Sequence, residues 1–542
     1  MTQAALIHPP APPAPAGPAP GRRGLLRRAS DRADWLGPIA VALFAGLLRF
    51  WDLGYPNAFV FDETYYPKDA WSLLRQGYEG TWPDSANADI LTVPQSIPLT
   101  SAPEFIAHPP LGKWVIALGE QLFGLHPFGW RFMTALLGTL TVLMLARIGR
   151  RLFGSTLVGC TAALLMSVDG LQLVMSRVGL LDGVQMFFVL AAFGSLLIDR
   201  DHARARLAAA REGGAPDGDR IRLGLRPWRI AAGVALGAAC AVKWNGVMVL
   251  AAFGLLTVLW DQSGRRWAGA RRPWRSMLRR DAVPALLAMV GSALVVYVGS
   301  WAGWLAAGGE PAGGGYDRHW ADDRAGLSPD KVLGIPLPQV SMSWVPAPLR
   351  SLWHYHGQMY DFNTGLSTPH TYQSNPFSWL VQSRPVSMYW EQVPNGQRGC
   401  TASGGCAAQI LGLGTPLLWW TACFALVYLL WRWFFRRDWR SGAVLCAVAG
   451  IYLPWFQYQE RTVFSFYMVV LVPFLCLAVA QMLGAMLGPE GCSPERRRIG
   501  AAGAGLIVLA VMACFAFFHP LYTAEVIPMT SWQDRMWLTT WV

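Results

Sequence analysis

Long apolar runs alternate with short polar segments along most of the chain. A helix needs about 20 mostly apolar residues to cross the hydrocarbon core of a bilayer. Eleven runs approach this length, at residues 35–54, 128–149, 155–176, 179–199, 229–244, 245–260, 282–305, 411–431, 441–458, 463–485 and 499–518. The division between 229–244 and 245–260 is the least sharply marked. The pattern predicts an all-α polytopic membrane protein with about 11 transmembrane helices.

The basic residues indicate the direction in which the chain crosses the membrane. Most of the 45 Lys and Arg residues lie in the tail 1–34 and in the segments 147–154, 200–229, 261–281, 432–440 and 486–498. Loops rich in Lys and Arg stay on the cytoplasmic side. We therefore expect a multi-pass plasma-membrane protein with a cytoplasmic N-terminus, a disordered cytoplasmic tail at 1–34, and its chemistry on the extracytoplasmic face.

This orientation divides the chain into an N-terminal transmembrane module at 35–305 and C-terminal transmembrane helices at 411–518. The module contains a first outer loop at 55–127, which we expect to be catalytic. A second large outer loop occupies 306–410, and an outer C-terminal tail occupies 519–542. The second loop has no long periodic helix in its sequence, and we expect it to fold over the membrane face.

Composition and charge exclude several classes of protein. Hydrophobic residues make up 53% of the chain and charged residues 14%, whereas a soluble domain has about 25% charged residues. The net charge of +12 does not predict a nucleic-acid partner, because the basic residues lie in short loops between apolar runs. Motifs for ATP binding, dinucleotide binding and serine hydrolysis are missing from the sequence. A transporter is disfavoured, since the runs carry few charges apart from Asp169 and show no duplication.

Two adjacent carboxylates, Asp62 and Glu63, follow the first apolar run and lie between aromatic residues. A carboxylate at a membrane surface can act as the general base that takes a proton from a hydroxyl. An alternative is that Asp62 caps a helix over Thr64–Leu74. The stretch from Tyr65 to Leu74 has an amphipathic pattern, which predicts a helix lying in the membrane interface.

Cations at the ends of apolar runs next to outer turns are a second candidate feature. The sequence His108-Pro109-Pro110-Leu111-Gly112-Lys113 is followed by Arg131, by Arg177 with Leu180-Leu181-Asp182, and by Lys243-Trp244-Asn245-Gly246. Such positions suit the binding of a lipid phosphate headgroup. Snorkelling of single side chains to the interface is the alternative explanation.

The second loop contains His354 and His356, followed by the polar stretch from Gly365 to Pro376 and by Arg384-Pro385. A His-x-His pair could hold a metal, but further ligands at zinc-like spacing are missing from the sequence. Hydrogen bonding and stacking on a sugar or lipid headgroup are favoured instead. Cys400 and Cys406 form a possible disulfide if this loop faces an oxidising compartment.

In this order and on this topology, these motifs resemble the dolichyl- or polyprenyl-phosphate-mannose–protein mannosyltransferases in their shorter, actinobacterial-type bacterial form. The resemblance extends from about residue 35 to residue 518. It is carried by Asp62-Glu63, His108 to Lys113, Arg177 with Asp182, Lys243-Trp244, Gly365 to Pro376 with Arg384-Pro385, and Arg461. The large insert that eukaryotic members carry in the second loop is missing here, so acceptor selection does not transfer from those relatives.

The resemblance implies a GT-C glycosyltransferase fold and assigns roles to residues. Asp62 would be the general base, and Glu63 would position the acceptor or the sugar. The donor phosphate and sugar would be bound by Arg49, Arg131, Arg177, Lys243, His108, His370 and Arg461. Acceptor or headgroup contacts would come from Tyr65, His354, His356 and Tyr372.

The implied reaction is an inverting transfer of mannose from polyprenyl-phosphate-mannose to Ser or Thr hydroxyls of secreted proteins, with the secretory translocon as an expected partner. Because a lipid phosphate is a good leaving group once cations offset its charge, we expect no obligatory cofactor or metal; the sequence does not exclude a divalent ion. The alternative is a GT-C transferase that moves aminoarabinose or arabinofuranose from another lipid-linked donor to a glycolipid or polysaccharide.

Overall fold

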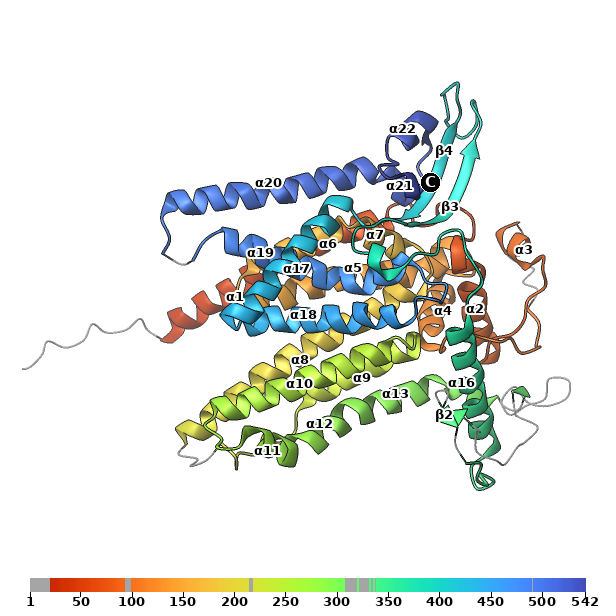
Figure 1. The fold of residues 1–542 in the computed structure, drawn as a ribbon. Coiled ribbons are helices and arrows are strands. Elements are labelled where there is room, and N and C mark those ends of the chain that lie inside the picture. Colours follow the sequence, from red (N-terminus) through yellow and green to blue (C-terminus); the bar gives the residue numbers. More distant parts are fainter. Residues whose placement is uncertain are drawn as a thin grey trace, which may run out of the picture.

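The computed structural model describes residues 20–92, 99–213, 218–307, 319–320, 331–332, 335–336, 338–489 and 491–542. Figure 1 shows long helices lying side by side, with most of the connecting polypeptide gathered at one end of the bundle. We call this the loop end; it contains residues 51–92, 99–110 and 338–415. The opposite end contains residues 218–226 and 268–272.

Each of the eleven predicted apolar runs coincides with helical structure. In chain order the helices are α1 (Pro20–Phe50), α5 (Pro127–Phe153), α6 (Thr156–Ser167) with α7 (Gly170–Arg177), α8 (Leu181–Glu212), α9 (Pro227–Val242), α10 (Gly246–Trp267), α11 to α13 (Pro273–Ser300), α17 (Pro416–Arg436), α18 (Trp439–Tyr452), a 3-10 turn with α19 (Ser465–Met486), and α20 (Pro494–Phe518). The division of 229–260 falls at Lys243–Asn245, where it was predicted.

Seven of the described helices are long and apolar enough to cross a membrane, or eight if α6 and α7 count as one bent span. The remaining runs lie in α1 and in the shorter helices α9 and α18. Helix α1 begins at Pro20, inside the segment 1–34 for which we expect a disordered tail. Residues 1–19 of that segment lie outside the described residues.

The third run was predicted as one continuous span, and the structure breaks it. Helices α6 and α7 meet at an angle of 64°. Asp169 is the N-cap of α7, and its carboxylate accepts a hydrogen bond from the backbone N–H of Gln172. The same carboxylate accepts from the Trp419 indole at 2.8 Å and from the Thr415 N–H at 3.1 Å. The bend therefore has a local cause that hydropathy does not reveal.

The bundle core is built around α19, with α6, α17 and α8 beside it. The apolar window of the Ser465–Met486 span is 89% buried, and Phe193 of α8 packs edge-on against Phe474 of α19. Helices α5 and α6 approach closely because Gly159 has no side chain. A Cβ atom at this position would lie 2.4 Å from the carbonyl oxygen of Ala146.

The loop end has its own secondary structure. The first loop holds a 3-10 helix (Phe61–Thr64), α2 (Tyr66–Gln76), α3 (Ala86–Thr92) and α4 (Leu111–Phe123). The second holds α14 (Ala302–Ala306), the short strands β1 (Lys331–Val332) and β2 (Ile335–Pro336), α16 (Ala347–Gly365), β3 (Val386–Val393) and β4 (Cys406–Gly412). The C-terminal tail adds α21 (Pro520–Thr523), β5 (Ile527–Pro528) and α22 (Met529–Gln533).

Two features of this end differ from the sequence-based expectation. Helix α16 has 19 residues, although no long helix was predicted in the second loop. Strands β3, β4 and β5 form an antiparallel sheet in that order, with Trp390 opposite Gln409 and Ala407 opposite Ile527.

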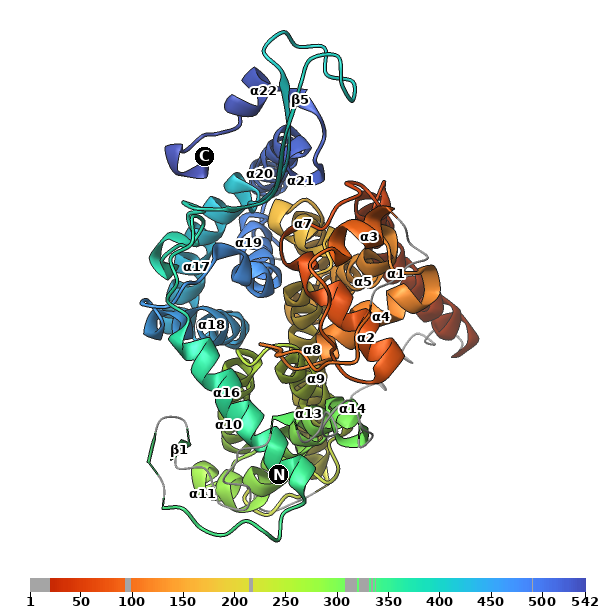
Figure 2. The same ribbon diagram turned by 90° about the vertical axis from the view of Figure 1, so that its right-hand side faces the viewer.

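A disulfide joins Cys400 and Cys406 at the tip of the β3–β4 hairpin. Figure 2 views the molecule onto this end and shows α16 running beside the ends of α10 and α13.

Candidate active site

Asp62 lies in the 3-10 helix between α1 and α2, at the loop end. The alternative role as a helix cap is wrong, because the N-cap of α2 is Tyr65 and the cap has no side-chain hydrogen bond. The Tyr66 hydroxyl donates a hydrogen bond to the Asp62 carboxylate. Burial raises the pKa of Asp62 to about 6, while the charge of Lys243 opposes this rise and that of Asp182 adds to it. Asp62 is thus a carboxylate that can take and release a proton near neutral pH.

A buried ion pair stands next to Asp62. Lys243 is the C-cap residue of α9, and Asp182 lies in the first turn of α8. The Lys243 Nζ and Asp182 Oδ2 atoms are 2.7 Å apart, and the two residues are 7% and 1% exposed. Among the described residues, Asp182 Oδ1 is buried without a hydrogen-bond partner. This oxygen is free to accept a hydrogen bond from a bound molecule.

The turn that carries Lys243 is fixed from α8. The side-chain amide of Gln185, one turn after Asp182, donates to the carbonyl oxygen of Lys243 at 3.0 Å and to the Asn245 side chain at 2.6 Å. Gln185 is itself 1% exposed. The position of the Lys243 ammonium group is therefore determined at both ends of the residue, by Gln185 at the backbone and by Asp182 at the side chain.

His108, Tyr467 and Arg461 surround the same site. The Lys243 Nζ lies 5.2 Å from the centre of the Tyr467 ring, and the ring centres of His108 and Tyr66 are 6.3 Å apart. Burial, followed by the charges of Lys243, Lys113 and Arg461, lowers the pKa of His108 well below its usual value, so this imidazole is neutral. Arg461 hydrogen-bonds the Tyr467 hydroxyl and the backbone oxygen of Asn363.

Glu63 and Arg131 do not reach this site, contrary to expectation. Glu63 is 0% exposed and makes a two-pronged ion pair with Arg131, with both distances 2.8 Å. The remaining donors of the Arg131 guanidinium bind the carbonyl oxygens of Leu53, Pro56 and Ala58. With every donor engaged, Arg131 has no free N–H for a donor phosphate. The pair instead fixes the segment that leads into Asp62.

Arg177 and Arg49 are also engaged inside the protein. Arg177 donates to the carbonyl oxygens of Leu48 and Arg49, in the last turn of α1, and to those of Trp51 and Asp52 directly after it, where helical carbonyls lack partners. Arg49 is 0% exposed and donates to the Ala45 carbonyl and to the Gln172 side chain. Four hydrogen bonds of the Arg177 guanidinium hold the end of α1 and the residues after it, and Arg49 is enclosed between α1 and α7, so their contact with a donor phosphate stays a prediction.

The remaining expected contacts are dispersed over the loop end. His356 hydrogen-bonds Tyr297 and stacks on Trp244, with 5.7 Å between ring centres, next to Lys243. His370 packs edge-on against Phe464, which lies against Phe61. Tyr65 is 57% exposed, Tyr372 lies under the Arg384 guanidinium, and His354 contacts Gln358. In the described part of the chain, groups of three or more residues that could hold a metal are missing.

Sequence reasoning missed Tyr66, Tyr467 and a buried charge network that positions α2. Lys113 of α4 is 1% exposed and pairs with Glu79 at 2.8 Å and with Asp69 of α2 at 3.6 Å. Asp69 lies on α2, seven residues after Asp62, so this network holds the helix that follows the candidate base. The run from His108 to Lys113 contains the lysine of this network, but the sequence does not show which carboxylates pair with Lys113.

Comparison with known proteins identifies the family. Residues 39–302 match the family described as "Dolichyl-phosphate-mannose-protein mannosyltransferase", and residues 348–541 match "C-terminal four TMM region of protein-O-mannosyltransferase". The chain is 37% identical to the polyprenol-phosphate-mannose–protein mannosyltransferase of Mycolicibacterium smegmatis, over 94% of each protein. The Corynebacterium glutamicum protein with the same description is 33% identical over 92% of each.

The fold is also known. The structure of the S. cerevisiae protein O-mannosyltransferase Pmt1–Pmt2 complex bound to the sugar donor matches with a TM-score of 0.68 at 16% identity, covering 94% of this chain and 93% of that one. The expected GT-C glycosyltransferase fold is confirmed, and the protein is a polytopic membrane protein. The chain belongs to the dolichyl-phosphate-mannose–protein mannosyltransferase family.

Proposed function

We propose that the protein transfers mannose from polyprenyl-phosphate-mannose to Ser or Thr hydroxyls of proteins. The observation that carries the proposal is the pairing of a carboxylate of raised pKa, Asp62, with a buried ammonium group, Lys243, at one end of a membrane bundle. Transfer to a hydroxyl needs a base for the acceptor and positive charge for the phosphate. The descriptions of the mycobacterial and corynebacterial relatives support the choice of sugar and acceptor.

Asp62 acts as the general base in this proposal. Its carboxylate takes the proton of the acceptor hydroxyl while the hydroxyl oxygen forms a bond to the anomeric carbon of mannose. The bond between that carbon and the phosphate oxygen breaks, and the electron pair leaves with the lipid phosphate. Attack opposite the leaving group inverts the anomeric configuration. A pKa of about 6 leaves Asp62 ionised before the reaction at neutral pH and still basic enough to hold the proton.

Lys243 and Arg461 stabilise the departing phosphate. Both cations lie next to Tyr467. The Lys243 ammonium group faces the ring of Tyr467, and Arg461 hydrogen-bonds its hydroxyl. Fixed positive charge in a water-poor site lowers the energy of the developing phosphate anion. Because two side chains supply this charge, we propose that the reaction needs no obligatory divalent ion. Asp182 Oδ1, which has no partner among the described residues, accepts a hydrogen bond from the sugar. Asp182 Oδ2 holds Lys243 in place.

The loop end faces the extracytoplasmic side of the plasma membrane in this proposal. Support comes from the Lys- and Arg-rich segments at the opposite end, which the positive-inside rule assigns to the cytoplasm. The Cys400–Cys406 disulfide at the hairpin tip fits an oxidising compartment. Acceptor proteins would then reach the site after secretion through the translocon.

The test is transfer of labelled mannose from polyprenyl-phosphate-mannose to a peptide rich in Ser and Thr, by the purified full-length protein. Asp62→Asn removes the proton acceptor with little change in shape, so transfer falls about 10²- to 10⁴-fold while donor binding persists. Asp361→Asn, at an exposed carboxylate of α16 on the same end, is the matched control and keeps full activity. Near-normal transfer by Asp62→Asn would remove Asp62 from the role of base.

A second measurement separates the proposed substrate from the alternative donors. An unlabelled lipid-phosphate pentose, such as the arabinofuranose donor, is added in excess over the labelled mannose donor. Unchanged labelling of the peptide supports the mannose specificity. Suppressed labelling, together with transfer of a labelled pentose from the arabinofuranose donor to a glycolipid in a parallel assay, would favour the alternative reaction.

A further inference from the structure

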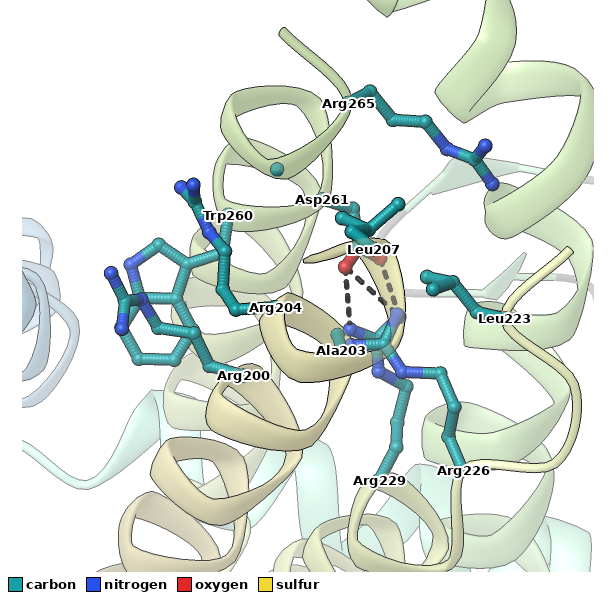
Figure 3. A pocket seen from close by; sticks show the side chains of 11 residues that line it. Arg200, Ala203, Arg204, Leu207, Leu223, Arg226, Arg229, Trp260, Asp261 and Arg265 are labelled. Carbon is teal, nitrogen blue, oxygen red and sulfur yellow. Dashed lines mark hydrogen bonds and ion pairs between the residues drawn. The ribbon is translucent and has the colours of Figure 1, made fainter. Parts of the chain in front are cut away.

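A pocket at the opposite end of the bundle, away from Asp62, is lined by an excess of basic residues. Helices α8, α9 and α10 form it, and five arginines line it, Arg200, Arg204, Arg226, Arg229 and Arg265, with Asp261 as the one acidic residue of its described lining. Figure 3 shows Arg200, Arg204 and Trp260 on one side of the pocket and Arg226, Arg229 and Asp261 on the other. The mechanism above uses none of these residues.

Three of the five arginines are neutralised by carboxylates. Arg226 pairs with Asp199 at 2.6 Å and with Asp261 at 2.8 Å. Arg229 pairs with the same two carboxylates at 3.0 Å and 2.6 Å, so two cations and two anions balance. Arg265 makes a two-pronged pair with Asp281 at 2.8 and 2.9 Å. These pairs explain how the ends of α8, α9 and α10 are held together, and they leave no charge to bind a ligand.

Arg200 and Arg204 carry the excess charge. They lie four residues apart on α8, which places the two guanidinium groups on one face of the helix, where like charges repel. Among the described residues, the nearest carboxylate to Arg200 is Asp201 at 3.5 Å, and Asp201 is bound more closely by Arg151 at 2.8 Å. Arg204 donates one hydrogen bond, to the Ser263 hydroxyl at 3.0 Å. Both guanidinium groups therefore retain N–H donors for an anion.

Tryptophans place these two arginines at the depth of lipid headgroups. The Arg200 guanidinium lies 3.4 Å from the ring centre of Trp439 and 5.6 Å from that of Trp260. Arg204 lies 5.4 Å from the ring centre of Trp267, which is 48% exposed. Tryptophan side chains gather where hydrocarbon meets headgroups, and basic pockets between spanning helices bind the phosphates of anionic lipids.

We propose that Arg200 and Arg204, which are partly exposed at the edge of this pocket, together bind the phosphate headgroup of an anionic phospholipid. The phosphate oxygens accept charge-assisted hydrogen bonds from both guanidinium groups, which removes the repulsion between them. The Arg200 side of the site lies beside Trp260 of α10 and Trp439 of α18, at the end of the bundle opposite Asp62. The site depends neither on the identity of the transferred sugar nor on the direction in which the chain crosses the membrane.

The experiment titrates the purified full-length protein in neutral detergent with phosphatidylglycerol and counts bound lipids by native mass spectrometry. The double variant R200Q/R204Q is expected to bind about 30-fold more weakly, since each basic side chain at a membrane surface contributes on the order of fivefold. The variant R200K/R204K keeps the charge and most of the binding. The double variant R497Q/R498Q removes two exposed arginines at the start of α20, which lies outside the pocket, and keeps the wild-type affinity.

The control variants and a second ligand decide between outcomes. Unfolding midpoints and elution volumes that match the wild type show that R200Q/R204Q is folded. Equal loss of lipid by R200Q/R204Q and R497Q/R498Q would mean that lipid follows total charge, which overturns the site. Inorganic phosphate that displaces the bound lipid at an equal concentration would make this a site for a soluble anion and would also overturn the proposal.

Discussion

Asp62 has a protonation state that burial and Lys243 set together. Burial raises its pKa to about 6, and the base must be ionised to accept a proton. The rate of mannose transfer at low donor concentration should therefore rise with pH through about 6 and level off above it. Initial rates measured between about pH 4.5 and 8 give this profile. A rate that is independent of pH over this range would contradict the assignment of Asp62 as the base.

Lys243→Gln should move the same inflection to higher pH. Burial and the Asp182 carboxylate raise the pKa of Asp62, and the Lys243 cation lowers it. Without the cation, burial and Asp182 therefore raise this pKa further. The KM for the donor should also rise, because one phosphate contact is lost. Lys68→Gln is the control, since Lys68 on α2 interacts with Glu104 and Asp69 rather than with Asp62. An inflection that Lys243→Gln leaves in place would exclude this coupling.

Among the elements, the segment Leu53–Glu63 depends on one buried ion pair. Glu63→Gln leaves the Arg131 guanidinium charged and buried among backbone carbonyls, and breaking such a pair costs about 3–5 kcal/mol. Unfolding of the purified protein in mixed micelles should show a loss of this size, with activity falling as the loop loses order. The double variant Glu63→Gln/Arg131→Gln should recover part of the stability because no unpaired charge remains. Wild-type stability in Glu63→Gln would show that the pair does not hold the segment.

The bend between α6 and α7 rests on Asp169. Asp169→Ala removes the cap of α7, worth about 1 kcal/mol, and leaves the Trp419 indole and the Thr415 amide without their acceptor, at about 1–3 kcal/mol each. The free energy of unfolding should fall by at least about 3 kcal/mol. Ser155→Ala removes the cap of α6 alone and should cost about 1 kcal/mol. Equal effects of the two substitutions would mean that the Trp419 and Thr415 contacts do not stabilise the bend.

At the scale of the whole molecule, hydropathy predicted where the helices lie and which ends of them carry the loops. It could not predict the breaks and contacts that depend on three-dimensional neighbours. Arg131 and Arg177 look in the sequence like free cations beside outer turns, but the carbonyl oxygens that occupy them become visible only when α1 and its loop are folded. Asp62 and Lys243 are 181 positions apart, and α8 brings them together through Asp182. The sequence supplied the residue types of the site, and the packing of α8 and α9 decided which of them meet.

Labelling from one side of the membrane tests the proposed orientation of the whole molecule. Ser403→Cys places a thiol at the exposed hairpin tip of the loop end, and Arg498→Cys places one at the exposed start of α20, at the opposite end. If the basic segments stay in the cytoplasm, a membrane-impermeant maleimide should label Ser403→Cys in intact cells and Arg498→Cys only after permeabilisation. The wild type is the background control, because its seven free cysteines are at most partly exposed. The reverse pattern would place the Asp62 site in the cytoplasm, where acceptors need no translocon and the disulfide would not persist.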